Sequence, residues 1–145
     1  MHLHMIAFKG TAIAILAGAA LAASAPAQGT FVNWESPHVH PLDLTPDGTR
    51  LLVVNTPDTR LEIFDVTGEA PVLVGEVAVG LDPVSVRARS DGEAWVVNHV
   101  SDTVSIVDLA TARVRATLDT EDEPTDVVFA GTDRAFVSCS AANRV

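Results

Sequence analysis

From residue 40 onward, short apolar runs alternate with turn-forming residues, and the runs fall into two successive sets of four. The first set lies at 40–44, 50–55, 59–65 and 71–79, and the second lies at 83–88, 94–98, 103–108 and 113–118. In each set an Asp-Gly pair separates the first run from the second. This is turn chemistry, because Gly takes a positive φ and Asp hydrogen-bonds its own turn. No helical periodicity accompanies the runs, so the pattern predicts an all-β fold of short antiparallel strands.

The second and third runs of each set differ in their patterns. The second run reads LLVV in one copy and AWVV in the other, which is apolar on both faces and predicts a strand buried between two neighbouring sheets. The third run alternates, with Leu61 and Ile63 on one face and Glu62 on the other, and Ser105 takes the place of Glu62 in the second copy. We therefore expect Glu62 and Ser105 to point away from the core.

The two sets are copies of one repeat. Asn55 and Asn98 stand 43 residues apart, and Pro83 and Pro124 stand 41 apart at the start of a third copy. Units of about 40 to 45 residues with four strands are typical of β-propeller blades, and one blade cannot bury its faces alone. We predict four-stranded antiparallel meanders with a period of 41–43 residues that stack as β-propeller blades. The blades lie at about 40–80 and 81–120, and a partial blade lies at 121–145.

The repeat also carries a family pattern, PxxVxxxxDGxxxxVVNxxxDTVSIVDLxTxxV, over residues 83–114. With Val97-Asn98, and with Val53 to Asn55 in the first copy, where the family has Val-Thr-Asn, the chain from His40 onward resembles the YVTN family of bacterial β-propeller repeat proteins. The resemblance implies seven blades, so we expect this chain, with about two and a half, to be the N-terminal fragment of a longer protein. The alternative is a short chain that assembles several copies into one ring. No single activity is implied, because the superfamily includes lactonase-like enzymes, quinoprotein dehydrogenases and binding scaffolds.

The N-terminus has the pattern of a secretory signal peptide. Lys9 precedes the uncharged apolar run 10–23, and the Ala-rich segment 25–28 fits a cleavage site, so we expect residues 1–27 to be removed. The apolar run is shorter than a membrane span requires, and we predict a periplasmic or secreted protein with no stable membrane span after cleavage. Residues 28–39 form an N-terminal leader, in which the FVNW segment is either a closing strand or loosely ordered.

The composition excludes one class of partner. The chain has 9 basic and 19 acidic residues and a net charge of −10, and an acidic surface of this kind repels phosphate backbones, so we expect no nucleic-acid partner. Cys139 is the single cysteine and forms no internal disulfide. Its thiol is either buried or paired with something outside this chain.

The candidate site follows from the meander topology. The link into each first strand and the loop between the second and third strands emerge on the same edge, which in propellers usually carries the ligand. The ligand-face candidates are His38, His40, Asp82, His99, Asp102, Glu123 and Asn143.

Two segments contain residue types that could bind a metal. His38 and His40 could chelate a metal, since alternate strand residues point the same way, but two ligands do not make a site and we favour loop histidines bonded to backbone. The acidic run 119–126 has oxygen ligands suited to calcium, but it lacks the spacing and Gly of a calcium loop, so we favour a solvated loop. We therefore predict no metal site in this segment.

The leading hypothesis is an exported β-propeller scaffold that binds a protein or small ligand on its loop face, without catalysis or a cofactor in this segment. No nucleophile elbow, phosphate loop or zinc-protease motif is present in the sequence. The alternatives are the N-terminal part of a periplasmic redox enzyme with a fused c-type cytochrome domain, or a lactonase-like hydrolase. Haem c would then bind in a portion beyond this chain, which has no Cys-x-x-Cys-His.

Overall fold

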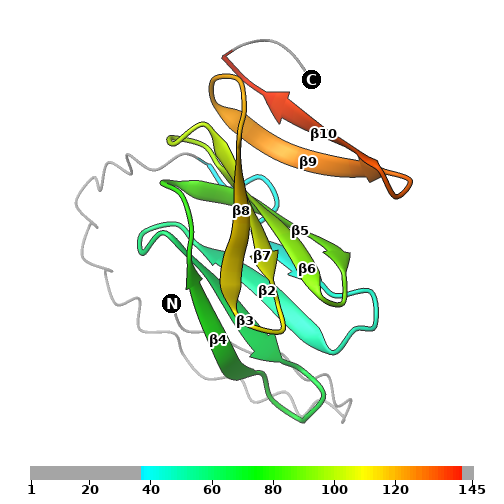
Figure 1. Cartoon of the computed structure of the whole chain (residues 1–145). Coiled ribbons are helices and arrows are strands. Elements are labelled where there is room, and N and C mark those ends of the chain that lie inside the picture. Colours follow the sequence, from blue (N-terminus) through cyan, green and yellow to red (C-terminus); the bar gives the residue numbers. More distant parts are fainter. Residues whose placement is uncertain (1–36, 142–145) are drawn as a thin grey trace, which may run out of the picture. The chain divides into compact units, whose positions relative to one another are not determined.

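Ten β-strands make up the regular structure of residues 37–141, the part of the chain that the computed structural model describes (Figure 1). The strands are β1 (Leu42–Leu44), β2 (Arg50–Asn55), β3 (Arg60–Asp65), β4 (Val72–Ala78), β5 (Pro83–Ser90), β6 (Glu93–Asn98), β7 (Thr103–Asp108), β8 (Arg113–Asp119), β9 (Pro124–Ala130) and β10 (Arg134–Cys139). The predicted signal peptide, the FVNW segment and Asn143 lie outside the described residues.

The strands form three antiparallel sheets in chain order. The first sheet contains β1 to β4, the second contains β5 to β8, and the third contains β9 and β10. The two four-stranded sheets repeat each other closely, since Asn55 pairs with Arg60 and Asn98 pairs with Thr103 in the same register. The register shift after Ile63 in β3 recurs after Ile106 in β7. The prediction of four-stranded antiparallel meanders is confirmed for both sheets.

The core lies between the stacked sheets. Leu52, Val54 and Leu61 of the first sheet pack against Val86 and Val96 of the second, and all are at most 1% exposed. A smaller cluster of Val97, Val104 and Val127 joins the second sheet to the third. The predicted double-sided burial of the second strands is confirmed for the last four residues of β2 and the last three of β6.

Two details of the sequence analysis were wrong. Ser105 does not point to solvent: it is buried, and its hydroxyl accepts a hydrogen bond from the Asn98 amide at 3.0 Å. Ser105 shares the face of Val96 and Val107, which packs against the first sheet, and the alternation alone could not indicate that this face is covered. Gly48 has the expected positive φ of 70°, but Gly92 does not, so the second Asp-Gly turn has a different geometry from the first.

The start of the first strand was also placed too early. Val39 and His40 do not belong to the first sheet: their amides donate to the carbonyl of Val84 at 2.9 and 3.2 Å, and His40 forms a parallel bridge with Ser85 of β5. Residues 39–40 are therefore hydrogen-bonded to the second sheet, although β1 directly after them belongs to the first sheet. Within residues 37–141 no helix is long and apolar enough to cross a bilayer.

Candidate functional site

The loops that precede β5 and β9 lie against the loops that follow β6 and β10. The amide of His99 donates to the carbonyl of Asp82 at 2.9 Å, and the amide of Ser140 donates to that of Glu123 at 2.8 Å. These hydrogen bonds define one edge of the stack, which we call the loop edge: residues 37–41, 56–59, 79–82, 99–102, 120–123 and 140–141. The meander topology predicted this arrangement, because the link into each first strand and the loop between the second and third strands emerge on the same edge.

The loop edge has a repeated backbone conformation. Thr59, Asp82, Asp102 and Glu123 all have φ between 51° and 54°, in the left-handed region that L-residues rarely adopt. Each of these four carbonyls accepts a hydrogen bond from an amide of the facing loop, at 2.8 to 3.0 Å. The left-handed conformation therefore points each carbonyl at the facing loop, where it accepts a hydrogen bond. Asp is among the residues that tolerate this conformation best.

His38 and Thr56 connect the first sheet to the second. The hydroxyl of Thr56 donates to the carbonyl of Pro83 at 2.7 Å, so its oxygen accepts from Nε2 of His38, which lies 2.6 Å away. His38 therefore carries its proton on Nε2 and contacts protein through that atom. The partner is a side-chain hydroxyl, whereas we expected the loop histidines to bond to backbone.

His99 makes the same connection one repeat later. Its Nδ1 lies 3.0 Å from the carbonyl of Pro124, and because a carbonyl only accepts, Nδ1 carries the proton. Thr56 and His99 are 43 residues apart and both reach the carbonyl of the first proline of the next sheet. His99 thus links the second sheet to the third by a hydrogen bond. In its neutral form its Nε2 carries a lone pair.

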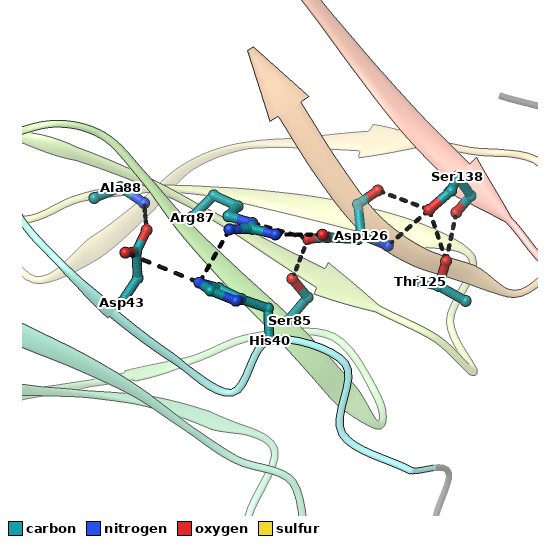
Figure 2. A network of polar contacts seen from close by, with 8 residues as sticks. All are labelled: His40, Asp43, Ser85, Arg87, Ala88, Thr125, Asp126 and Ser138. Atoms are coloured by element: carbon teal, nitrogen blue, oxygen red, sulfur yellow. Dashed lines mark hydrogen bonds and ion pairs between the residues drawn. The ribbon is translucent and has the colours of Figure 1, made fainter.

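His40 lies apart from these two, in a polar network that crosses all three sheets (Figure 2). The guanidinium of Arg87 donates through Nε and Nη2 to the two carboxylate oxygens of Asp126, at 3.0 and 2.5 Å, and through Nη1 to Nε2 of His40 at 3.1 Å. Since arginine only donates, His40 accepts here and is neutral. The carboxylate of Asp43, at 3.9 Å from the same nitrogen, is therefore not an ion-pair partner of His40.

The carboxylate of Asp126 is the centre of this network. It also accepts from the hydroxyl of Ser85 at 2.6 Å. Burial raises the pKa of Asp126, but the hydrogen bonds from Arg87 and Ser85 lower it by more, so the pKa lies below the usual range of an aspartate. Asp126 is therefore a carboxylate at neutral pH, in a bidentate pair with Arg87.

The network extends in both directions along the first strands of the sheets. On one side, Asp43 of β1 accepts from the amide of Ala88 at 2.8 Å. On the other, Ser138 lies 2.7 Å from the hydroxyl of Thr125 and accepts from the amide of Asp126 at 3.2 Å (Figure 2). Side chains from β1, β5, β9 and β10 thus form one continuous polar layer.

The remaining candidates are separate from this network. Asp102 accepts from the amide of Glu123 at 2.9 Å, and Glu123 accepts from the hydroxyl of Ser140 at 2.9 Å. One carboxylate oxygen of Asp82 is buried without a hydrogen-bond partner, and so is the amide oxygen of Asn98. In the described part of the chain, no group of three or more His, Cys, Asp or Glu side chains is arranged to hold a metal ion.

Cys139 is buried at the end of β10. Burial raises the pKa of its thiol, and the carboxylates of Glu121, Asp102 and Asp122 act in the same direction. The thiol is therefore protonated at neutral pH and unreactive. This position corresponds to the first of the two alternatives for Cys139, a buried thiol.

Arg87 and Asp126 are the site residues that the sequence analysis missed as a pair. They are 39 residues apart, on the first strands of different sheets. The sequence does contain one signal for this pair. Ser85 and Asp126 occupy the same repeat position, 41 residues apart. An aspartate at a position that is buried in the fold requires a cation nearby. The nearest candidate in the sequence is Arg87.

Comparison with known proteins supports the fold. A scan against protein-family models and a search of the curated proteins found no match. Among solved structures, hydrazine synthase from Kuenenia stuttgartiensis is similar, with a TM-score of 0.64 and 28% sequence identity over 78% of this chain. A second structure, Hsv2 from Kluyveromyces marxianus, matches 70% of the chain at 14% identity with a TM-score of 0.47. The chain spans 32% and 33% of these two proteins.

Proposed function

We propose that this chain is part of an exported β-propeller scaffold of the YVTN kind, and that its loop edge binds a partner protein or small ligand. The propeller is supported by three sheets that repeat one register and stack face to face through apolar clusters. The period of 41–43 residues is that of a propeller blade. The export is supported by the N-terminal sequence.

The observation that carries the binding role is the mixed surface of the loop edge. Leu81 and Val100 are 56% and 58% exposed, and their backbones are joined by a hydrogen bond of 3.3 Å. Ionisable or hydrogen-bonding side chains flank this apolar pair, with His99 next to Val100 and Asp82 next to Leu81. An exposed apolar patch with polar neighbours, held by backbone hydrogen bonds, is typical of the centre of a binding surface.

A selection experiment tests the binding role. Peptides selected from a phage library of random dodecamers against the immobilised chain are expected to lose at least about tenfold in affinity when both Leu81→Ser and Val100→Ser are introduced. Val72→Ser, at the opposite edge and 60% exposed, is the matched control and should leave the affinity unchanged. Peptides that are insensitive to the double substitution and sensitive to Val72→Ser would contradict the proposal.

An enzymatic role in a longer protein is the second candidate. It is favoured by the likeness to part of a solved synthase at 28% identity, together with the family resemblance to quinoprotein and lactonase-like enzymes. A redox enzyme with a fused c-type cytochrome domain would contribute a haem absorbance band to the exported protein. Under our leading proposal, combined substitution of His38, His40 and His99 by alanine leaves any enzymatic activity of the full protein unchanged. Loss of activity in a folded triple variant would favour the enzymatic role.

A further inference from the structure

The loop edge contains acidic side chains and no lysine or arginine. Its acidic residues are Asp58, Asp82, Asp102, Glu121, Asp122 and Glu123. Asp82 and Asp102 are half-buried, and the other four are exposed. Arg60 follows the edge directly, but its guanidinium lies 3.6 Å from the carboxylate of Glu76 on β4. A surface of this composition attracts cations and repels anions.

The opposite edge of the same sheets differs, because arginines lie there beside acidic side chains. Glu93 at the start of β6 lies 2.7 Å from Arg115 and 3.6 Å from Arg89. Asp133 before β10 lies 4.0 Å from Arg134. No such ion pair between described residues involves the aspartates of the loop edge. The two edges therefore differ in the charge that they present to a partner.

The apolar pair Leu81 and Val100 lies within this acidic surface. Besides the hydrogen bond between their backbones, the amide of Leu81 donates to the hydroxyl of Ser101 at 3.1 Å. Asp82 follows Leu81 in the chain, and Asp102 stands two residues after Val100. The pair is thus held in place with a carboxylate near each member. Such a surface is complementary to an apolar side chain that is flanked by basic ones.

Two buried oxygens close to the pair accept no hydrogen bond from the described residues. They are one carboxylate oxygen of Asp82 and the amide oxygen of Asn98. Asn98 is fully buried, and its side chain lies against Gly80, the residue before Leu81. Further along the edge, burial and the nearby carboxylates raise the pKa of the Cys139 thiol, which is consistent with a negative potential there. A partner that supplies positive charge and hydrogen-bond donors would complement this edge.

We propose that the loop edge binds a basic segment of a partner protein, in which an apolar side chain flanked by arginine or lysine contacts Leu81 and Val100. The apolar contact supplies most of the affinity, and the charges speed association and select against acidic partners. This inference rests on the proposed function, because it names the chemistry of the partner at the same edge. A small organic cation would depend on the charges alone, since it has no apolar side chain to place on the pair.

A peptide titration tests the proposal. The probe is a fluorescein-labelled peptide, Gly-Ser-Arg-Arg-Leu-Val-Arg-Arg-Ser-Gly, and its fluorescence anisotropy is measured as the full chain is added. Saturable binding is expected. A peptide with glutamate in place of every arginine should not bind. A peptide that keeps the arginines but has serine in place of leucine and valine should bind at least about tenfold more weakly.

Charge variants of the chain show where the basic peptide binds. Asp82→Asn with Asp102→Asn removes two charges but keeps the side-chain oxygens, one of which accepts from the amide of Glu123. This variant should bind the peptide about fivefold more weakly and with a smaller dependence on salt. Asp91→Asn with Asp133→Asn removes the same charge at the opposite edge. It is the matched control and should change the affinity by less than about twofold.

The outcomes separate this inference from the proposed function. Absence of binding, equal losses in the two charge variants, or equal binding of the basic peptide and its serine form would overturn the inference. Where the first charge variant does not fold, Leu81→Ser with Val100→Ser tests the same contact and should weaken the basic peptide at least about tenfold. If peptides selected from the phage library bind the loop edge but are acidic or uncharged, the proposed function stands and this inference fails. If no peptide depends on the loop edge, both fail.

Discussion

The Arg87–Asp126 pair is the strongest polar contact between sheets among the described residues. Both side chains are about one third exposed or less, and the guanidinium meets both carboxylate oxygens. A bidentate charge-assisted pair with limited solvent screening stabilises more than an ordinary surface ion pair. Because the two residues lie on different sheets, the pair contributes to the stacking and not to the folding of a single hairpin.

Asp126→Asn is expected to lower the free energy of unfolding at pH 7 by about 1 to 2 kcal/mol, since the hydrogen bonds to a charged acceptor are lost. The pKa of Asp126 is lowered by its partners, so its contribution is complete above the ordinary aspartate pKa of about 3.9 and is lost as the pH falls through the folded value. Urea unfolding at pH 7 and pH 2.5 should therefore give a difference between the two proteins that shrinks at the lower pH.

Asp133→Asn is the control for this measurement, because the Asp133 side chain is 81% exposed and lies 4.0 Å from its charged neighbour. Its stability should equal that of the unchanged chain at pH 7. If Asp126→Asn is as stable as this control at pH 7, the Arg87–Asp126 pair does not hold the sheets together.

At the scale of elements, the loop before β5 depends on close backbone approach at Gly80. Gly80 precedes β5 and lies against the side chains of Asn98 and Ser101, so that a Cβ at this position would lie 2.6 Å from Cγ and 2.7 Å from Cβ of Asn98. Asn98 is fully buried and is held by hydrogen bonds to Thr103 and Ser105. The loop therefore has little freedom to move away from an added methyl group.

Gly80→Ala is expected to destabilise the chain by about 1 to 3 kcal/mol, the usual cost of overpacking a buried site. Gly92→Ala is a matched control, because a Cβ at Gly92 would meet nothing within 4 Å and its φ is not positive. Thermal unfolding followed by circular dichroism would measure both. Equal melting temperatures for the two variants would show that the loop before β5 adjusts at no cost.

At the scale of the whole molecule, stability comes from stacking one sheet on the next. Neighbouring residues of a strand face opposite sides, and in β9 these sides differ sharply: Val127 is 1% exposed and packs against the second sheet, whereas Val128 is 63% exposed. Exposed Leu42 and Leu44 lie on β1 of the first sheet. Apolar surface is therefore left uncovered on the first and third sheets within the described residues.

Val127→Asp should unfold the third sheet or lower the stability by more than about 4 kcal/mol, because it buries an unpaired charge. Val128→Asp, one residue away, should change the stability by less than about 0.5 kcal/mol and reduce aggregation by removing exposed apolar area. Urea unfolding and light scattering measure the two effects. A large loss of stability in Val128→Asp would show that this face is covered in solution.

The repeat, the strand order within each sheet and the position of the loop edge follow from the sequence by itself, because strands and turns depend on the pattern of residues close together in the chain. Contacts between residues 18 to 47 positions apart depend on how one sheet is offset against the next, which no local pattern encodes. For that reason only the tertiary structure decided that Arg87 pairs with Asp126, that Ser105 is buried, and that His38 and His99 act as ties between sheets while His40 accepts from Arg87.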